Sequence, residues 1–418
     1  MTLFKRPDLF RANSLATVAL VTIASALSAC TTVTDRPAQA ETTLDLTEFE
    51  RIFATAQTDA DAPGASIAIS VDGVTVWSDA FGLASVELDV AARPDTRFRI
   101  GSTSKPMTVT VLARMVERGE VAWDDTIGQY LPNLPEALKT ITLAELASNR
   151  SGIRHYRDRE FRDGERVWWQ HFPSTESSLS LFKDDPLVST PGDTFHYSTY
   201  GWTLLAAVLE AAAGQDFPTL LHKDVFGPLR MTDTQIDHAF LFVPNRTQFY
   251  WRAPTGQLTN APFTENSYKW AGGGIVSTSD DLLRFANGWL DGTIVPPDLR
   301  EVMWTNQTVR DGTETVYGLG WFVGYDDVIS RFSDSGETVP VGLRGLSDAG
   351  IHVIEHRGGQ IGGSTVLWIF PDFDIVVTGS WNMTGEGRKL YAATLQIACQ
   401  TIAAQADAPE IRCSGHSE

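Results

Sequence analysis

The sequence has few of the residues that build metal centres or disulfide scaffolds. Only three cysteines occur among 418 residues, and the eight histidines are scattered along the chain. No Cys-x-x-Cys and no His-Glu-x-x-His pattern is present, whereas zinc sites usually need ligands at such close spacing. We therefore expect no metal site. Twelve Trp and 21 Phe predict instead a substantial apolar core.

Positive charge is scarce as well. Lys and Arg number 33 against 52 Asp and Glu, so the formal net charge is −19. This balance argues against nucleic-acid binding and against adhesion to anionic lipid through a charged face. The hydrophobic share of 43% excludes a disordered chain. The length allows about two or three ordinary domains, or one large domain with an insertion.

The N-terminus carries an apolar run that is too short to span a membrane. Residues 15–27 are uncharged and follow a basic start, but a membrane-spanning helix needs roughly 20 apolar residues. This pattern is typical of a signal peptide. The run ends in Leu27-Ser28-Ala29-Cys30, which resembles the lipobox of bacterial lipoproteins.

The lipobox resemblance implies that residues 1–29 are removed and that Cys30 becomes a lipidated first residue, with residues 30–44 as a polar tether. The alternative is cleavage after Ala40, which would release a secreted protein. The residues after Cys30 carry no acidic retention signal, which favours the outer membrane. We expect an exported protein that faces the periplasm or another extracytoplasmic space and meets the membrane only through its lipid anchor.

Patterns typical of β-hairpins lie near both ends of the remaining chain. The first hairpin would join residues 66–71 and 74–77, and the second would join residues 365–370 and 375–380. Two further strand-like runs, residues 317–323 and 351–356, precede the second hairpin. Helical spacing precedes the first hairpin at 44–56 and follows the second at about 386–404.

These patterns predict an α+β domain over residues 45–418. One antiparallel sheet built from both chain ends would carry the terminal helices on one face. A large helical insertion, about residues 102–315, would cover the other face, and a cleft would form where this insertion meets the sheet.

Two cysteines, Cys399 and Cys413, lie close together near the C-terminus. An exported protein meets an oxidising compartment, in which such a pair can form a disulfide. The alternative is one buried thiol and one free thiol near the chain end. We expect the disulfide.

Lysine occurs only seven times, and two of these lysines have a serine three residues earlier, in the pairs Ser102 with Lys105 and Ser180 with Lys183. Residues at i and i+3 lie on one face of a helix. An uncharged Lys amine in that position can take the serine proton and make the hydroxyl a nucleophile. Either pair could therefore carry catalysis, and their surroundings separate them.

Ser102 stands at the start of a long helical pattern. Pro106 suits a first turn, apolar residues follow at helical spacing, and Gly119 ends the pattern. The N-terminus of a buried helix favours developing negative charge. Ser180 is instead followed by Lys-Asp-Asp-Pro, which ends a helix at the surface. The sequence therefore favours Ser102 as the nucleophile.

Two further motifs can contribute to the same chemistry. Tyr197-Ser-Thr199 precedes an apolar helical stretch, so the tyrosine hydroxyl could point into a cleft, although an isolated Tyr is more commonly part of the core. His356-Arg-Gly-Gly359 follows a strand. Glycine there lets a substrate approach, and a free backbone N–H can serve an oxyanion. The alternative for this motif is a simple turn.

In this order, Ser102-x-x-Lys105, Tyr197-Ser-Thr199 and His356-x-Gly358 resemble the penicillin-recognising serine hydrolases, which include class C β-lactamases, DD-peptidases and related esterases. Four motifs are similar, more narrowly, to the mitochondrial β-lactamase-like serine proteases and their bacterial relatives: Phe98-Arg-Ile-Gly-Ser102, Ser151-Gly-Ile-Arg-His-Tyr156, Tyr197-Ser-Thr199 and Asn266-Ser-Tyr-Lys-Trp-Ala-Gly-Gly-Gly274. The resemblance covers most of residues 45–400.

The resemblance implies a role for each matching residue. Ser102 would be the acylated nucleophile, Lys105 its base, and Tyr197 the relay that passes a proton to the leaving group. The backbone N–H groups of Ser102 and Gly359 would form the oxyanion hole. Further residues would contact the substrate: Thr199, Gly273, His356, Arg357 and Gly358.

The chain departs from class C β-lactamases at two of these positions. Thr199 stands where they usually have Asn, and His356 stands where they have Lys. Both changes favour peptide or ester substrates over penicillins. A charged His356, helped by Arg357, could still hold an acidic substrate end, and substrate affinity would then weaken as the pH rises through the histidine pKa.

The sequence thus predicts an exported serine hydrolase that cleaves small amide, peptide or ester substrates through an acyl-enzyme, without a metal or organic cofactor. An esterase or a weak β-lactamase is the alternative within the same fold. A non-catalytic module that binds the cell wall or assembles with itself is the alternative from another class. The sequence predicts neither the natural substrate nor the number of subunits.

Overall fold

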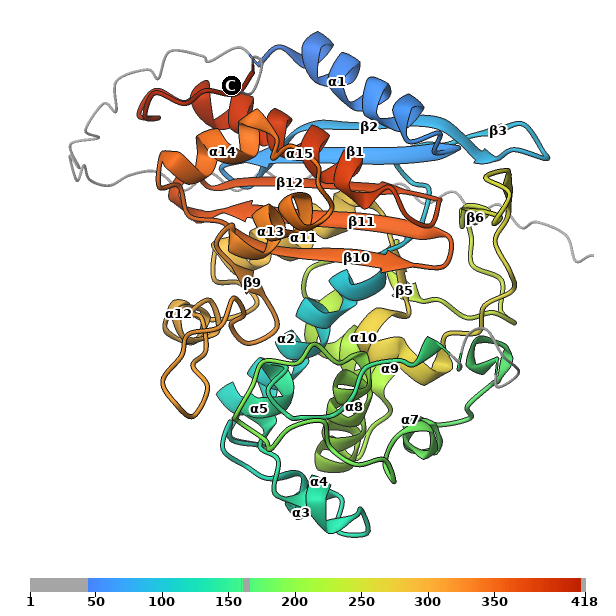
Figure 1. The fold of residues 1–418 in the computed structure, drawn as a ribbon, viewed down its shortest axis with the longest axis vertical. Coiled ribbons are helices and arrows are strands. Elements are labelled where there is room, and N and C mark those ends of the chain that lie inside the picture. The colour runs from blue at the N-terminus through green and yellow to red at the C-terminus, as the bar shows by residue number, and fades with distance from the viewer. Residues whose placement is uncertain (1–43, 159, 161–165, 415–418) are drawn as a thin grey trace, which may run out of the picture. The chain divides into compact units, whose positions relative to one another are not determined.

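The computed structural model describes residues 44–158, 160 and 166–414, so the expected signal peptide, Cys30 and most of the tether lie outside the described residues. A seven-stranded antiparallel sheet has the order β3-β2-β1-β12-β11-β10-β9 (Figure 1). Its strands are β1 Gly64–Val71, β2 Val74–Ser85, β3 Val90–Ala91, β9 Phe322–Val323, β10 Ile354–Gln360, β11 Gly363–Phe370 and β12 Ile375–Trp381.

The two ends of the chain meet in the middle of this sheet. Strands β1 and β12 pair from Ala65 opposite Trp381 to Val71 opposite Ile375. The expected hairpins are β1–β2 and β11–β12. Asp72, at the tip of the first hairpin, has a φ of 50°, which Asp tolerates better than most residues. The predicted α+β class, with a sheet built from both chain ends, is confirmed.

One expected strand is much shorter than its pattern predicts. Of residues 317–323, only Phe322 and Val323 join the sheet, as β9. Two glycines explain the difference. Gly320 has a φ of 86°, and a Cβ on Gly318 would lie 2.2 Å from the carbonyl oxygen of Met303. The chain therefore turns sharply here, against the end of the helix that closes with Met303, before it reaches the sheet.

Helices from both chain ends cover one face of the sheet. These helices are α1 Leu46–Asp59, α13 Asp326–Asp334, α14 Val341–Asp348 and α15 Gly387–Ala403. Helix α15 packs on β11 and β12 and against α1 and α14. Fully buried side chains such as Phe53, Trp368 and Leu390 fill the layer between them. The terminal helices thus bury one face of the main sheet, which includes β10.

Most of the remaining helices form the helical half of the molecule, below β10 in Figure 1. They are α2 Ser104–Glu117, α3 Ile127–Tyr130, α4 Glu136–Lys139, α5 Leu143–Ala147, α7 Thr175–Ser178, α8 Thr199–Ala213, α9 Phe217–Leu221, α10 Trp270–Gly273 and α12 Pro297–Met303. A further helix, α11 Ser279–Leu290, lies at the level of the sheet (Figure 1). Helix α11 packs directly on β1 and β12. Short strands complete this half: β4 Phe98–Arg99, β5 Gln235–Ile236 and β8 Ile275–Ser277. A separate hairpin, β6 Tyr250–Arg252 with β7 Leu258–Asn260, lies beside the main sheet (Figure 1).

In the described part of the chain, no individual helix has both the length and the apolar composition needed to cross a membrane. One bent pair of helices, Thr199–Ala213 with Phe217–Phe226, meets the length and composition test when the two are taken together.

A disulfide joins Cys399 on α15 to Cys413, 14 residues later. Cys399 is fully buried against the terminal helices. Because a crosslink of this length restricts the unfolded chain, we expect Cys413→Ser to lower the free energy of unfolding by up to about 3 kcal/mol. Urea denaturation of the oxidised wild type and of Cys413→Ser measures the effect, and the wild type in a reducing agent serves as a second comparison. An unchanged midpoint would show that the bond does not stabilise the fold.

Candidate active site

Ser102 and Lys105 lie at the N-terminal end of the buried helix α2. Ser102 belongs to the 3₁₀ turn η1 (Gly101–Thr103), which runs directly into this helix. Pro106 fits the first turn because helix-initial N–H groups have no helical acceptor. The spacing puts both side chains on one face, and Nζ of Lys105 lies 2.9 Å from Oγ of Ser102.

The Lys105 amine has no anionic partner among the described residues. The side chain is fully buried, and Nζ lies 2.6 Å from the carbonyl oxygen of Gly272 and 3.3 Å from Oγ1 of Thr199. Burial lowers the pKa of Lys105 well below its ordinary value of 10.5, and the nearby positive charge of Lys269 lowers it further. An uncharged amine donates to those two oxygens and keeps its lone pair for the Ser102 proton.

Tyr197 closes the other side of this pair. It lines the same cavity as Ser102, and its ring lies 4.8 Å from Nζ of Lys105. The ring also stacks on Phe322 at 6.3 Å, which fixes its orientation. Burial raises the pKa of the Tyr197 hydroxyl above its ordinary value of 10.0. The phenol therefore keeps its proton at neutral pH and can act as a hydrogen-bond donor.

Strand β10 brings two backbone N–H groups together beside Ser102. Its pairing with β9 ends at Glu355, and the following residues pack on η1 instead. A Cβ on Gly101 would lie 2.8 Å from the backbone nitrogen of Gly359. A Cβ on Gly358 would lie 1.8 Å from the carbonyl oxygen of Ile100. Glycine is therefore required at this contact, which places the Gly359 N–H next to the nucleophile turn.

A cavity of about 300 Å³ opens beside Ser102. The predicted residues Tyr197, Thr199, Gly273 and Gly359 all line it, as does the nucleophile candidate itself. Thr199 is the first residue of α8, and its hydroxyl accepts a hydrogen bond from the Lys105 amine. Gly273 lies close to Gly101, because a Cβ on Gly273 would be 3.6 Å from the Gly101 carbonyl carbon. The structure thus gathers these residues, which come from four separate segments, around one opening.

The expectation that His356 and Arg357 contact the substrate is not met, because side chains alternate along β10. His356 turns into the core, where it is fully buried, and its Nε2 lies 3.0 Å from the Tyr317 hydroxyl. Arg357 turns to the opposite face and pairs with Asp327 and Glu355. Neither side chain lines the cavity. Gly358 acts through backbone packing.

The expected pH effect of His356 is also corrected. Burial lowers the pKa of His356 well below its ordinary value of 6.5, and the charge of Lys105 lowers it further. The imidazole therefore stays neutral across the physiological range, with Nδ1 donating to the Arg357 carbonyl oxygen. Its titration does not account for substrate binding near neutral pH.

Two polar residues in the cavity had no role assigned from the sequence. Lys269 and Gln360 line it, and the Lys269 amine donates to Oε1 of Gln360 at 3.1 Å. Lys269 falls within the long Asn266–Gly274 motif, and a lysine set between aromatic residues in an apolar stretch was the available signal. Aromatic residues form another part of the wall: His155, Tyr156, Trp168 and Tyr268.

The second Ser-x-x-Lys pair is a surface feature, as its sequence context predicts. The Ser180 hydroxyl donates to the carbonyl oxygen of Ser177, and Lys183 pairs with Asp184 in solvent. The two side chains therefore do not form a nucleophile and base.

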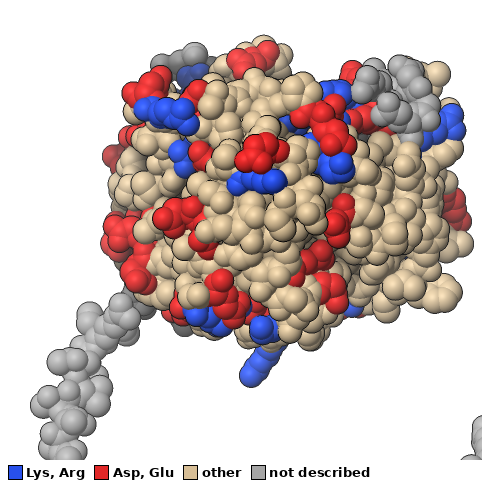
Figure 2. Space-filling view, turned by 90° about the horizontal axis from the view of Figure 1, so that it is seen from below, with Lys and Arg blue, Asp and Glu red and all other residues tan. Residues whose placement is uncertain are grey.

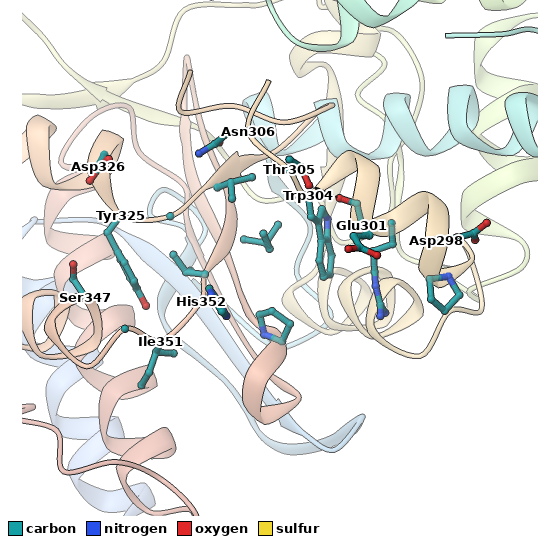
Figure 3. A pocket seen from close by; sticks show the side chains of 18 residues that line it. Asp298, Glu301, Trp304, Thr305, Asn306, Tyr325, Asp326, Ser347, Ile351 and His352 are labelled. Carbon is teal, nitrogen blue, oxygen red and sulfur yellow. Dashed lines mark hydrogen bonds between the residues drawn. The ribbon is translucent and has the colours of Figure 1, made fainter. Parts of the chain in front are cut away.

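A larger cavity lies elsewhere in the described part of the chain. It measures about 850 Å³ and is lined by Trp304, Tyr325, Ile351 and His352 among others, with carboxylates such as Glu301 around it (Figure 3). It contains neither a Ser–Lys pair nor any of the predicted site residues. Within the described residues, no group of three or more His, Cys, Asp or Glu side chains is placed to hold a metal ion. The candidate nucleophile and its neighbours therefore lie at the smaller cavity.

Comparison with known proteins agrees with this geometry. Residues 49–400 match the family model described as Beta-lactamase. The chain belongs to the beta-lactamase family. This member is 30% identical to the human serine beta-lactamase-like protein LACTB, mitochondrial, over 74% of this chain and 69% of the relative. It is 27% identical to a D-aminopeptidase of Brucella anthropi, over 66% of this chain and 52% of that protein.

Solved structures show the same fold in other family members. The octameric penicillin-binding protein homologue from Pyrococcus abyssi superposes with a TM-score of 0.68 at 22% sequence identity. The superposition covers 86% of this chain and 77% of that chain. This likeness confirms the predicted fold, and the family match over residues 49–400 confirms the predicted superfamily.

Proposed function

We propose that this beta-lactamase family member is an active serine hydrolase that works through an acyl-enzyme on Ser102. The observation that carries the proposal is the 2.9 Å contact between the Ser102 hydroxyl and the fully buried Lys105 amine. Burial without a carboxylate partner favours the uncharged form of a lysine amine. Such an amine is a base within reach of the proton that it must remove.

We assign one or more residues to each step of the proposed reaction. Oγ of Ser102 attacks the substrate carbonyl carbon while its proton moves to Nζ of Lys105. The N–H groups of Ser102 and Gly359 hold the oxyanion. Collapse of this intermediate breaks the bond to the leaving group, which receives a proton from Lys105 through Tyr197. Water then repeats the sequence, releases the acid and regenerates Ser102.

We propose amides and peptides as the first substrates, with esters as the alternative and β-lactams as poor substrates. Thr199 lacks the amide that Asn would offer to a β-lactam side chain, and His356 is buried and neutral. Neither residue supplies the contacts that class C β-lactamases are expected to make. The name of the related D-aminopeptidase of Brucella anthropi also favours amide hydrolysis.

A hydrolysis screen over peptides, esters and β-lactams tests this function, with Ser102→Ala as the matched control. The proposal expects turnover by the wild-type protein and none above background by the variant. Equal turnover by both proteins, or none by a folded wild type, would favour a non-catalytic binding or self-assembling module.

The lowered pKa of Lys105 predicts the pH dependence of this activity. The base must be unprotonated, so kcat/KM falls as the pH drops through the Lys105 pKa in the free enzyme. Because burial and Lys269 lower that pKa, we expect full activity near neutral pH. A pH profile that rises only near the ordinary lysine value of 10.5 would show that the amine is charged and is not the base.

We further propose that the protein is exported and anchored by a lipid on Cys30, as the lipobox-like sequence indicates. Mass spectrometry of the membrane-extracted protein should find a diacylated N-terminal Cys30, and Cys30→Ser should release the protein from membranes. A soluble wild type that begins after Ala40 would contradict the anchor and support secretion.

A further inference from the structure

A cation and an unused hydrogen-bond donor lie together in the active-site cavity. Lys269 is 6% exposed and lines the cavity, and its amine donates to Oε1 of Gln360. This bond fixes the amide orientation, so Nε2 of Gln360 presents its N–H groups elsewhere. Nε2 is buried and has no hydrogen-bond partner among the described residues. Buried donors without a partner are rare, and in a binding cavity they point to a ligand acceptor.

The charge of Lys269 is not neutralised by the groups around it. No carboxylate of the described residues forms an ion pair with Nζ, and Asp237, the acidic group that acts on this amine, already binds Arg99, Arg246 and Asn266. The other titratable groups that act on or respond to this amine are Lys105 and His155 in the site and Arg99 behind it. A protonated Lys269 therefore lacks an anion, and the cavity can accept one.

The position of this pair shows which part of a substrate it would meet. Gln360 follows Gly359 at the C-terminal end of β10, whereas Tyr197 stacks on Phe322, which contacts His356 three residues before Gly359. Along β10, Gly359, whose N–H would hold the oxyanion, thus lies between His356 on the Tyr197 side and Gln360. Because Tyr197 serves the leaving group in the proposed reaction, Lys269 and Gln360 face the acyl portion.

We propose that Lys269 and Gln360 form a specificity subsite for a carboxylate on the acyl portion of the substrate. The proposal rests on the proposed serine hydrolase function and names its substrate class. Lys269 supplies the charge, and Nε2 of Gln360 supplies a second donor, so a carboxylate can accept from both. A phosphate dianion fits less well, because it favours a second cation and the Arg99 guanidinium is held by Asp237.

Long-range attraction does not explain such a preference. The chain carries a net charge of −19, and acidic side chains are more widespread than basic ones on the face in Figure 2. An anionic substrate is therefore repelled at a distance and gains only from local contacts. The preference should accordingly appear in KM, and it should be strongest at low pH.

The test compares two peptide anilides that differ only by Glu or Gln at the acyl residue of the scissile bond. The wild type should favour the Glu substrate by at least about tenfold in kcat/KM. Lys269→Met should remove this preference, and Lys269→Arg should keep it. Gln360→Glu, which is nearly isosteric and places a carboxylate beside Lys269, should also remove it. Using the ratio of the two substrates cancels any shared effect on Lys105.

The pH dependence gives a second readout that a structural role would not change. The pKa of Lys269 is lowered to about 7. Burial is the main cause, the positive charge of Arg99 adds to it, and the negative charge of Asp237 acts in the opposite direction. The Glu preference of the wild type should therefore decline as the pH rises above neutrality, while Lys269→Arg should retain it. A preference that does not change with pH would overturn the role of Lys269.

The outcomes separate this proposal from the one on which it rests. If the wild type hydrolyses both anilides equally, the subsite is wrong and the hydrolase stands. If neither anilide is hydrolysed and Ser102 takes up no fluorophosphonate probe, the hydrolase itself is wrong. If Lys269→Met and Gln360→Glu still label at Ser102 but keep the Glu preference, the carboxylate is bound elsewhere.

Discussion

Lys105→Met should lower kcat/KM by about 10³- to 10⁴-fold, because the substitution removes the general base while it keeps the volume of the buried side chain. The amine is the base nearest to the Ser102 hydroxyl, at 2.9 Å, and it makes the local contacts to Thr199 and Gly272. Initial rates on the best substrate of the hydrolysis screen measure the effect, with thermal unfolding as the check on folding.

The chain supplies its own control for this substitution. Lys183 also follows a serine by three residues, but it pairs with Asp184 in solvent. Lys183→Met should therefore leave kcat/KM within about twofold of the wild type, since surface changes have small effects. If the two variants lost activity equally, or if Lys105→Met kept more than a tenth of it, the assignment of the base would be wrong.

Gly358→Ala should nearly abolish activity through the backbone. A Cβ at this position would lie 1.8 Å from the Ile100 carbonyl oxygen and 3.0 Å from Oγ1 of Thr103. Strand β10 must then move away from η1, which separates the two oxyanion donors. Loss of one such donor costs about 10²- to 10³-fold in kcat, and overpacking costs about 1–3 kcal/mol of stability. Rates and urea denaturation measure the two effects separately.

Gly359→Ala provides the comparison for this prediction. A Cβ at Gly359 would meet nothing within 4 Å, and the backbone N–H is kept. The variant should therefore lose much less activity than Gly358→Ala. Similar losses in both variants would indicate that the added methyl blocks substrate entry and that the β10–η1 contact is not the cause.

Local patterns in the sequence predicted much of the fold. Turn chemistry at Asp72-Gly73 placed the β1–β2 hairpin, and helical spacing placed α1 and α15. The α+β class followed from strands at both chain ends. The extent of β9 could not be predicted, because it depends on the close approach of Gly318 to the carbonyl oxygen of Met303, the last residue of α12.

The site was predictable where function depends on neighbours in sequence. Ser102 and Lys105 are one helical turn apart, so their contact follows from the spacing alone. The orientation of His356 required the register of β10 on β11, which places it in the core opposite Leu367. Lys269 and Gln360 are 91 residues apart, and only the tertiary fold shows that one orients the other.

Adduct mapping tests the central claim most directly. The folded protein is treated with a fluorophosphonate probe at neutral pH, and the modified peptide is identified by mass spectrometry. If Ser102 is the nucleophile and Lys105 its base, a single adduct should form on Ser102, none should form in Ser102→Ala, and Lys105→Met should be labelled much more slowly. Absence of an adduct on Ser102 in the folded wild type, or labelling at another serine that persists in Ser102→Ala, would contradict this assignment.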